Sequence, residues 1–151
     1  MINISDACEW FLQKGSVSHK KLQKLCFYAQ AWSYALKDDP LILDDNGKPL
    51  QFQAWVHGPV APVLYQKYSG NGWNSIPPEN RELNINSDDL ELLNSVWYTY
   101  GDSSGNALEA LSHTEMPWIN ACVGVKDGES SNKEIDVEDM KKYYKSIYLD
   151  N

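Results

Sequence analysis

A single long amphipathic segment, residues 18–37, limits most strongly what this chain can fold into. Ser18 is a good N-cap, and Asp38, Asp39 and Pro40 end the segment. Between these ends, apolar side chains recur at helical spacing: Leu22, Leu25, Cys26, Ala29, Trp32 and Leu36. A stripe of this length predicts a central helix around which shorter elements pack. The helix is either wrapped by its neighbours or shows a second aromatic face, since three residues lie off the stripe: Tyr28, Gln30 and Tyr34.

Shorter helices are expected on both sides of this segment. The first covers about residues 5–14, with Ser5 or Asp6 as its N-cap, and two more are expected over 87–100 and 104–112. Thr114 can cap a short helix that carries Pro117 in its first turn, and Asp136 can cap a last helix over 137–147. The pattern predicts an all-α fold, or a mainly α fold with a short strand pair, in which about six helices form one compact domain over residues 1–151.

The middle of the chain has a weaker pattern. Residues 51–56 alternate weakly, which predicts a short strand or an extended segment. Gly58 and Pro59 then favour the start of a helix that reaches about Tyr68. Residues 69–86 are rich in Asn, Gly and Pro, and predict a long exposed connection.

Charge and aromatic content indicate which partners suit this chain. Thirteen basic residues against twenty-one acidic ones give a net charge of -8, which makes nucleic acid a poor partner. The basic residues of 19–24, including Lys24, are interpreted as a solvated helix face. Six Trp and nine Tyr exceed what packing requires and favour protein recognition.

Nothing in the sequence predicts a metal site, a cofactor site or a catalytic residue. The three cysteines have no CxxC spacing, and the three histidines stand far apart in the chain. The cysteines fit a reducing cytoplasm, Cys26 as inert packing, and no leader or membrane span is expected.

Histidine, proline and tryptophan meet in two short blocks. The first block is Trp55-Val56-His57-Gly58-Pro59-Val60, and the second runs from Leu111-Ser112-His113 to Pro117-Trp118. In one interpretation each histidine bonds within a folded junction while the tryptophan packs in the core. In the other, the two blocks form a binding site.

These blocks, with Lys21-Leu22-Gln23-Lys24-Leu25 and Tyr28-Ala29-Gln30-Ala31-Trp32 before them, resemble the Panacea domain over nearly the full chain. That family includes SocA-like antitoxins and GepA-like phage-associated proteins. The resemblance implies an antitoxin that is not an enzyme and that binds a cognate toxin protein. It would act by occlusion, or as a proteolytic adaptor that delivers the toxin to a ClpXP-type protease through its ClpX-type unfoldase.

The candidate partner-binding residues follow from the aromatic content and these blocks: Trp32, Trp55, His57, Gly58, Pro59, His113, Pro117 and Trp118. One alternative is a hydrolase or transferase that uses His57 and His113, which burial of both histidines would exclude. Another is a phage or mobile-element protein that forms homo-oligomers through its aromatic face.

Overall fold

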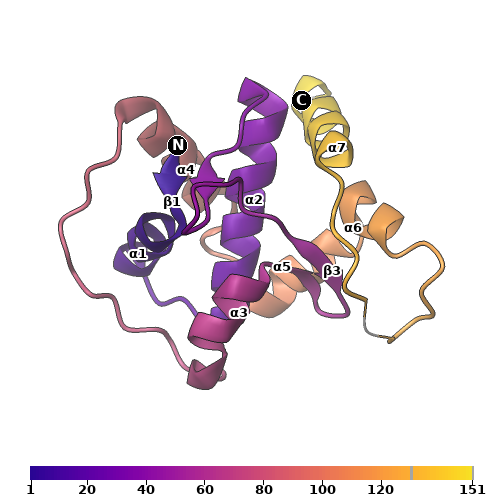
Figure 1. The fold of residues 1–151 in the computed structure, drawn as a ribbon, viewed down its shortest axis with the longest axis horizontal. Coiled ribbons are helices and arrows are strands. Elements are labelled where there is room, and N and C mark those ends of the chain that lie inside the picture. Colours follow the sequence, from indigo (N-terminus) through magenta and orange to yellow (C-terminus); the bar gives the residue numbers. More distant parts are fainter. Residues whose placement is uncertain (130, 151) are drawn as a thin grey trace.

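Helix α2 (His19–Lys37) is the axis of the fold in the computed structural model, which describes residues 1–129 and 131–150. Helices α1, α3, α4, α5 and α7 all pack against it, and α6 packs against α7. Figure 1 shows α2 upright in the centre, with α1 and α4 on one side and α6 and α7 on the other. This arrangement confirms the prediction of a mainly helical fold built around one central helix.

The described residues form seven α-helices, one 3-10 turn and two small strand pairs. Besides α2, the helices are α1 (Ile4–Lys14), α3 (Pro62–Tyr68), α4 (Ser87–Tyr100), α5 (Gly105–Ser112), α6 (Met116–Ala121) and α7 (Val137–Leu149), with the 3-10 turn η1 at Ser69–Asn71. The strands are β1 (Ile2–Asn3) and β2 (Ile42–Leu43), which are parallel, and β3 (Gln53–Trp55) and β4 (Gly58–Val60), which are antiparallel. None of the described helices is long and apolar enough to cross a lipid bilayer.

Neighbours surround α2 on every side. Tyr28 and Gln30 are fully buried although they lie off the main stripe. The helix is therefore wrapped by its neighbours and does not show a second aromatic face at these positions. The Gln30 amide donates to the carbonyls of Ile42 and Leu50 and accepts from two backbone N–H groups, and so ties the link after α2 to its side. Leu36, expected on the buried stripe, is 45% exposed and lines an open groove between α2, α4 and α7.

Some helix ends differ from the prediction. Helix α1 begins at Ile4, one residue earlier than expected, because Asn3 and neither Ser5 nor Asp6 provides the cap. Helix α6 begins after Glu115 without a side-chain cap, since the Thr114 hydroxyl donates to the Leu111 carbonyl. The predicted caps Ser18 and Asp136 are confirmed, and Ser104, expected as the first residue of its helix, is the N-cap of α5.

The largest difference concerns the block around His57. The predicted helix start at Gly58 and Pro59 is wrong, because these residues form β4, paired in a hairpin with β3. Gly58 has a φ of 101°, a conformation that favours glycine and that turns the chain back at the tip of the hairpin. Helix α3 begins only at Pro62, which takes the first-turn position that the prediction gave to Pro59. The extended segment expected over 51–56 is confirmed as β3.

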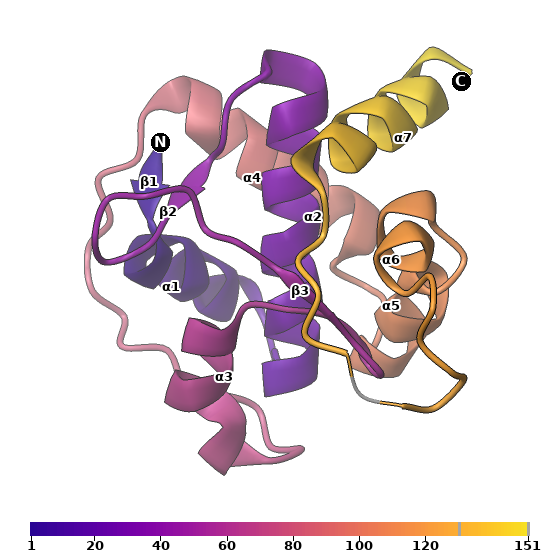
Figure 2. The ribbon, with the colours of Figure 1, turned by 45° about the vertical axis from the view of Figure 1, so that its right-hand side comes forward.

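The predicted long connection has no α-helix between η1 and α4, but it is not free of the core. Its backbone N–H groups at Glu79 and Asn80 donate to the buried Glu9 carboxylate of α1. Arg81 adds bonds to Asp6 and Ser5. The connection is therefore bound along α1, with which it lies side by side in Figure 2.

Candidate functional site

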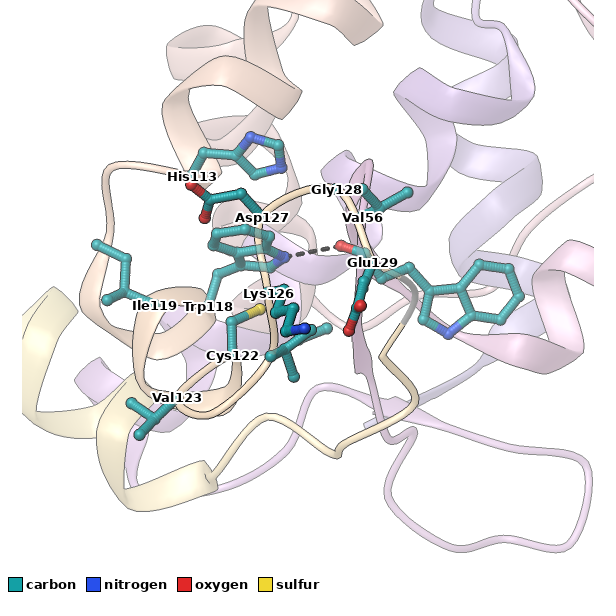
Figure 3. Close-up of a pocket in the computed structure, with 13 residues that line it drawn as sticks. Val56, His113, Trp118, Ile119, Cys122, Val123, Lys126, Asp127, Gly128 and Glu129 are labelled. Atoms are coloured by element: carbon teal, nitrogen blue, oxygen red, sulfur yellow. Dashed lines mark hydrogen bonds between the residues drawn. The ribbon is translucent and has the colours of Figure 1, made fainter.

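The two blocks that join histidine, proline and tryptophan come together in space. The Trp118 indole N–H donates to the Trp55 carbonyl over 2.9 Å, which joins α6 to the β3–β4 hairpin across 63 residues of sequence. We call the region formed by Trp55, His57, Glu109, His113 and Trp118 the hairpin junction. Figure 3 shows Trp118 and His113 next to the hairpin residue Val56, at the edge of a pocket of about 500 Å³.

His57 is the most accessible of the candidate residues. Its side chain is 69% exposed at the tip of the hairpin, and Nδ1 lies 3.3 Å from Glu109 Oε1 on α5. Glu109 also accepts a hydrogen bond of 2.7 Å from Lys20. Partial burial raises the pKa of Glu109, but the bonds from Lys20 and His57 outweigh that effect, so the pKa is lower than its ordinary value. The hairpin tip thus presents an imidazole against a charged carboxylate.

His113 is half-buried and stacks on Trp118, with ring centroids 4.1 Å apart. Burial lowers its pKa, although Glu109 and a backbone bond with Val56 act in the opposite direction. The Nε2 atom is buried and has no hydrogen-bond partner among the described residues. His113 is therefore a neutral, largely structural imidazole that supports Trp118.

The remaining candidates divide into two groups. Gly58, Pro59 and Pro117 are buried next to residues of the hairpin junction in the chain, whereas Trp55 is half-buried and exposes part of its ring. Trp32 is not part of the junction, because its indole N–H donates to the Tyr100 hydroxyl where α2 meets α4. The structure brings together all of the sequence-predicted site residues except Trp32.

Lys24 is a site residue that the sequence analysis missed. It was interpreted as part of a solvated face, but it is 1% exposed and donates from Nζ to the Pro59 carbonyl over 3.0 Å. Burial lowers its pKa to about 7, and the attraction of Glu109 offsets part of that effect. Its aliphatic stem lies directly under Gly58, where a Cβ would be 2.9 Å from Lys24 Cε. A signal was present in the sequence, since Lys24 and the buried Tyr28 are one helical turn apart.

Burial of Lys24 predicts an unusual pH dependence of stability. The unfolded chain keeps the proton up to its ordinary pKa of 10.5, whereas the folded chain releases it near pH 7. The unfolded state therefore binds more protons above pH 7, and the free energy of unfolding should rise by about 1–2 kcal/mol between pH 7 and 8.5. Urea unfolding across this range measures the slope.

Lys24→Met should abolish that slope, and Lys67→Met, a change at an exposed lysine, should keep it. A wild-type profile that is flat from pH 7 to 8.5, or a slope that persists in Lys24→Met, would contradict this interpretation of the lysine.

Burial of both histidines would have excluded an enzyme, but His57 is exposed and His113 is only half-buried, so the enzyme alternative is not excluded on this ground. The hydroxyl and thiol groups nearby are poor nucleophiles. Ser112 is buried and donates to the Glu109 carbonyl, and burial raises the pKa of the Cys122 thiol. Within residues 1–129 and 131–150, no cluster of three or more His, Cys, Asp or Glu side chains could hold a metal ion.

Comparison with known proteins agrees with the resemblance in sequence. The family model of SocA-like antitoxins, the Panacea domain, matches residues 22–119, which include most of α2, the hairpin and the start of α6. The chain is similar to Antitoxin SocA of Caulobacter vibrioides (strain NA1000 / CB15N), with 30% identity in an alignment of 124 residues that covers 68% of this chain. It spans 58% of the length of that relative. No solved structure matches it significantly. The chain belongs to the Panacea domain family of SocA-like antitoxins.

Proposed function

We propose that this chain is an antitoxin that binds a cognate protein toxin through the hairpin junction. The observation that carries the proposal is the convergence of the two histidine-tryptophan blocks, which places exposed His57 next to half-buried Trp55 and Trp118 on one surface. Aromatic side chains that are partly buried and rigidly held suit the centre of a protein interface. The name of the matching family and that of the SocA relative support the same role.

The junction is built as a preorganised surface. Trp118 is fixed by its bond to the Trp55 carbonyl and by the stacked His113, and His57 is held by Glu109. Side chains that are already ordered lose little conformational freedom on binding, which favours affinity. Nearby histidine and carboxylate groups would also suit a hydrolase. We favour binding because Ser112, the serine beside these groups, is buried beneath the hairpin and cannot reach a substrate as a nucleophile.

The proposed mechanism has two versions. In the first, the chain covers the active surface of the toxin in the cytoplasm. In the second, it is an adaptor that presents the bound toxin to a ClpX-type unfoldase and so to the protease. Co-expression with the product of the adjacent gene distinguishes them, because occlusion restores growth in cells without the protease and delivery does not. A neighbour that is harmless alone and does not co-purify would contradict both versions.

Alanine at the exposed part of the junction should weaken toxin binding without unfolding the chain. We expect the Trp55→Ala, His57→Ala double variant to bind the toxin at least about tenfold more weakly, since aromatic residues at an interface centre cost more than 1 kcal/mol each when truncated. Calorimetry on the purified complex measures the change. Trp73→Ala alters an indole that is 80% exposed and outside the junction, and should leave affinity within about twofold. An equal loss of toxin affinity in the double variant and in Trp73→Ala would show that the toxin interface lies outside the hairpin junction.

A further inference from the structure

A second surface with a distinct chemistry runs along the outward face of α4. Residues one helical turn apart form a stripe on that face: Asp88, Glu91, Ser95, Tyr98 and, just past the helix, Asp102. All five are exposed, and Tyr98 is 90% exposed, more than any other large apolar or aromatic residue among those described. Helix α4 contains no lysine, arginine or histidine, so every charged residue of the stripe is acidic.

An apolar groove of about 250 Å³ lies beside this stripe, where α4 meets α2 and α7. Its lining includes Leu36, Val96 and Tyr148 from the three helices. Leu36 and Tyr148 are 45% and 58% exposed, although both are large enough to reward burial. Exposed apolar side chains that gather around a groove are typical of a protein interaction site.

The carboxylates of the stripe form no ion pair within 4.0 Å with any residue that the structure describes. Lys37 donates instead to the backbone carbonyl of Asp88. Asp102 follows the C-terminal end of α4, where the helix dipole disfavours a carboxylate. Lys21 offsets this only in part, since its ammonium donates to the Gly101 carbonyl. A cationic partner would remove this repulsion.

We propose that the acidic stripe and the groove together bind an amphipathic segment of a partner protein, with its apolar side chains in the groove and its lysines or arginines against the carboxylates. Charge selects this occupant. A second copy of the chain would bring like charges together, and its net charge is -8. A phosphate backbone or an anionic membrane is repelled in the same way.

This surface is separate from the hairpin junction and shares no residue with it. Figure 1 and Figure 2 both show α4 behind α2, on the side away from β3. The proposal therefore goes beyond toxin binding at the junction, and loss of one site should leave the other intact.

The test uses a synthetic amphipathic helix of leucine and lysine, about 18 residues long so that it forms a stable helix. The full chain, labelled with ¹⁵N, is titrated with this peptide, and amide shifts give both the affinity and the binding site. The Glu91→Lys, Tyr98→Ser double variant should bind at least about tenfold more weakly, because it removes an aromatic anchor and reverses a charge. The matched control, Glu82→Lys with Trp73→Ser, makes the same changes at exposed positions elsewhere and should bind within about twofold of wild type.

Amide shifts confined to α4 and the neighbouring ends of α2 and α7, with weaker peptide binding only in the Glu91→Lys, Tyr98→Ser variant, would support the proposal. An equal loss of peptide affinity in both variants, amide shifts centred on the hairpin junction, or an absence of peptide binding to the wild-type chain would each overturn it. Sedimentation of the free chain adds one more outcome. Self-association that disappears in Tyr98→Ser would make a second copy the occupant and would also overturn the proposal.

Discussion

Replacing Glu115 with alanine is expected to lower the free energy of unfolding by about 3–5 kcal/mol, the largest effect of any single change that we consider. Glu115 is 4% exposed and accepts hydrogen bonds from two tyrosine hydroxyls, Tyr28 on α2 at 2.7 Å and Tyr144 on α7 at 2.9 Å. Alanine leaves both hydroxyls buried without an acceptor and also opens a cavity. Because these bonds join α2 to α7, the C-terminal helix should loosen first. Denaturant unfolding, followed by circular dichroism, measures the loss.

Glu115→Gln is the matched control. Burial raises the pKa of the Glu115 carboxyl, and the two tyrosine bonds offset only part of that effect. The folded chain therefore holds this proton to higher pH than the unfolded chain, and stability falls as pH rises above 4.5 towards the raised pKa. Glutamine keeps the acceptor oxygen and removes the titration, so it should cost less than about 1 kcal/mol near neutral pH. A glutamine variant as unstable as the alanine variant would contradict this account of the cluster.

Gly58→Ala is expected to destabilise the chain by about 2–4 kcal/mol and to distort the hairpin junction. Two costs add here. The φ of 101° strains any L side chain, and the new methyl group would lie 2.9 Å from both Lys24 Cε and Ser112 Oγ. Both of these neighbours are buried, so neither can move away into solvent. The change should therefore also weaken toxin binding, because the tip that carries His57 must shift.

Gly47→Ala separates the two costs. Gly47 also has a positive φ, of 76°, but a Cβ there meets nothing within 4 Å. This variant should lose only about 1 kcal/mol, through backbone strain alone, and should bind the toxin normally. Thermal unfolding of the two variants, run side by side, gives the comparison. Similar losses in both would show that the contact with Lys24 and Ser112 contributes nothing.

Most helices could be predicted from the local sequence, because they have a periodic apolar face and a polar side chain at the N-terminus that can act as a cap. Ser18 and Asp136 were identified on these grounds, and both cap their helices. The sequence allowed for a short strand pair and located its first strand within residues 51–56, but the second strand, β4, was predicted as the start of a helix. Gly58 followed by Pro59 satisfies the local rules for a helix start as well as those for a hairpin, and tertiary packing on Lys24 decides between them.

The part of the site that contains tryptophan and histidine could be predicted from the sequence. The part formed by charged residues that are buried through long-range contacts could not. The two blocks around His57 and His113 were identified from the sequence, but their contact through Trp118 depends on the packing of α5 and α6. Lys24 and Glu115 were missed for a common reason. Charged residues are usually exposed, and their burial here is compensated by partners 35 and 87 residues away in the chain.

The most direct test of the proposed function is amide hydrogen exchange of the chain, alone and with its co-purified toxin. If the toxin binds the hairpin junction, protection should increase at residues 55–60 and 109–118, and exchange at the exposed stripe of α4 should stay unchanged. Protection that appears only outside these two segments, or no change on addition of the toxin, would contradict binding at the hairpin junction.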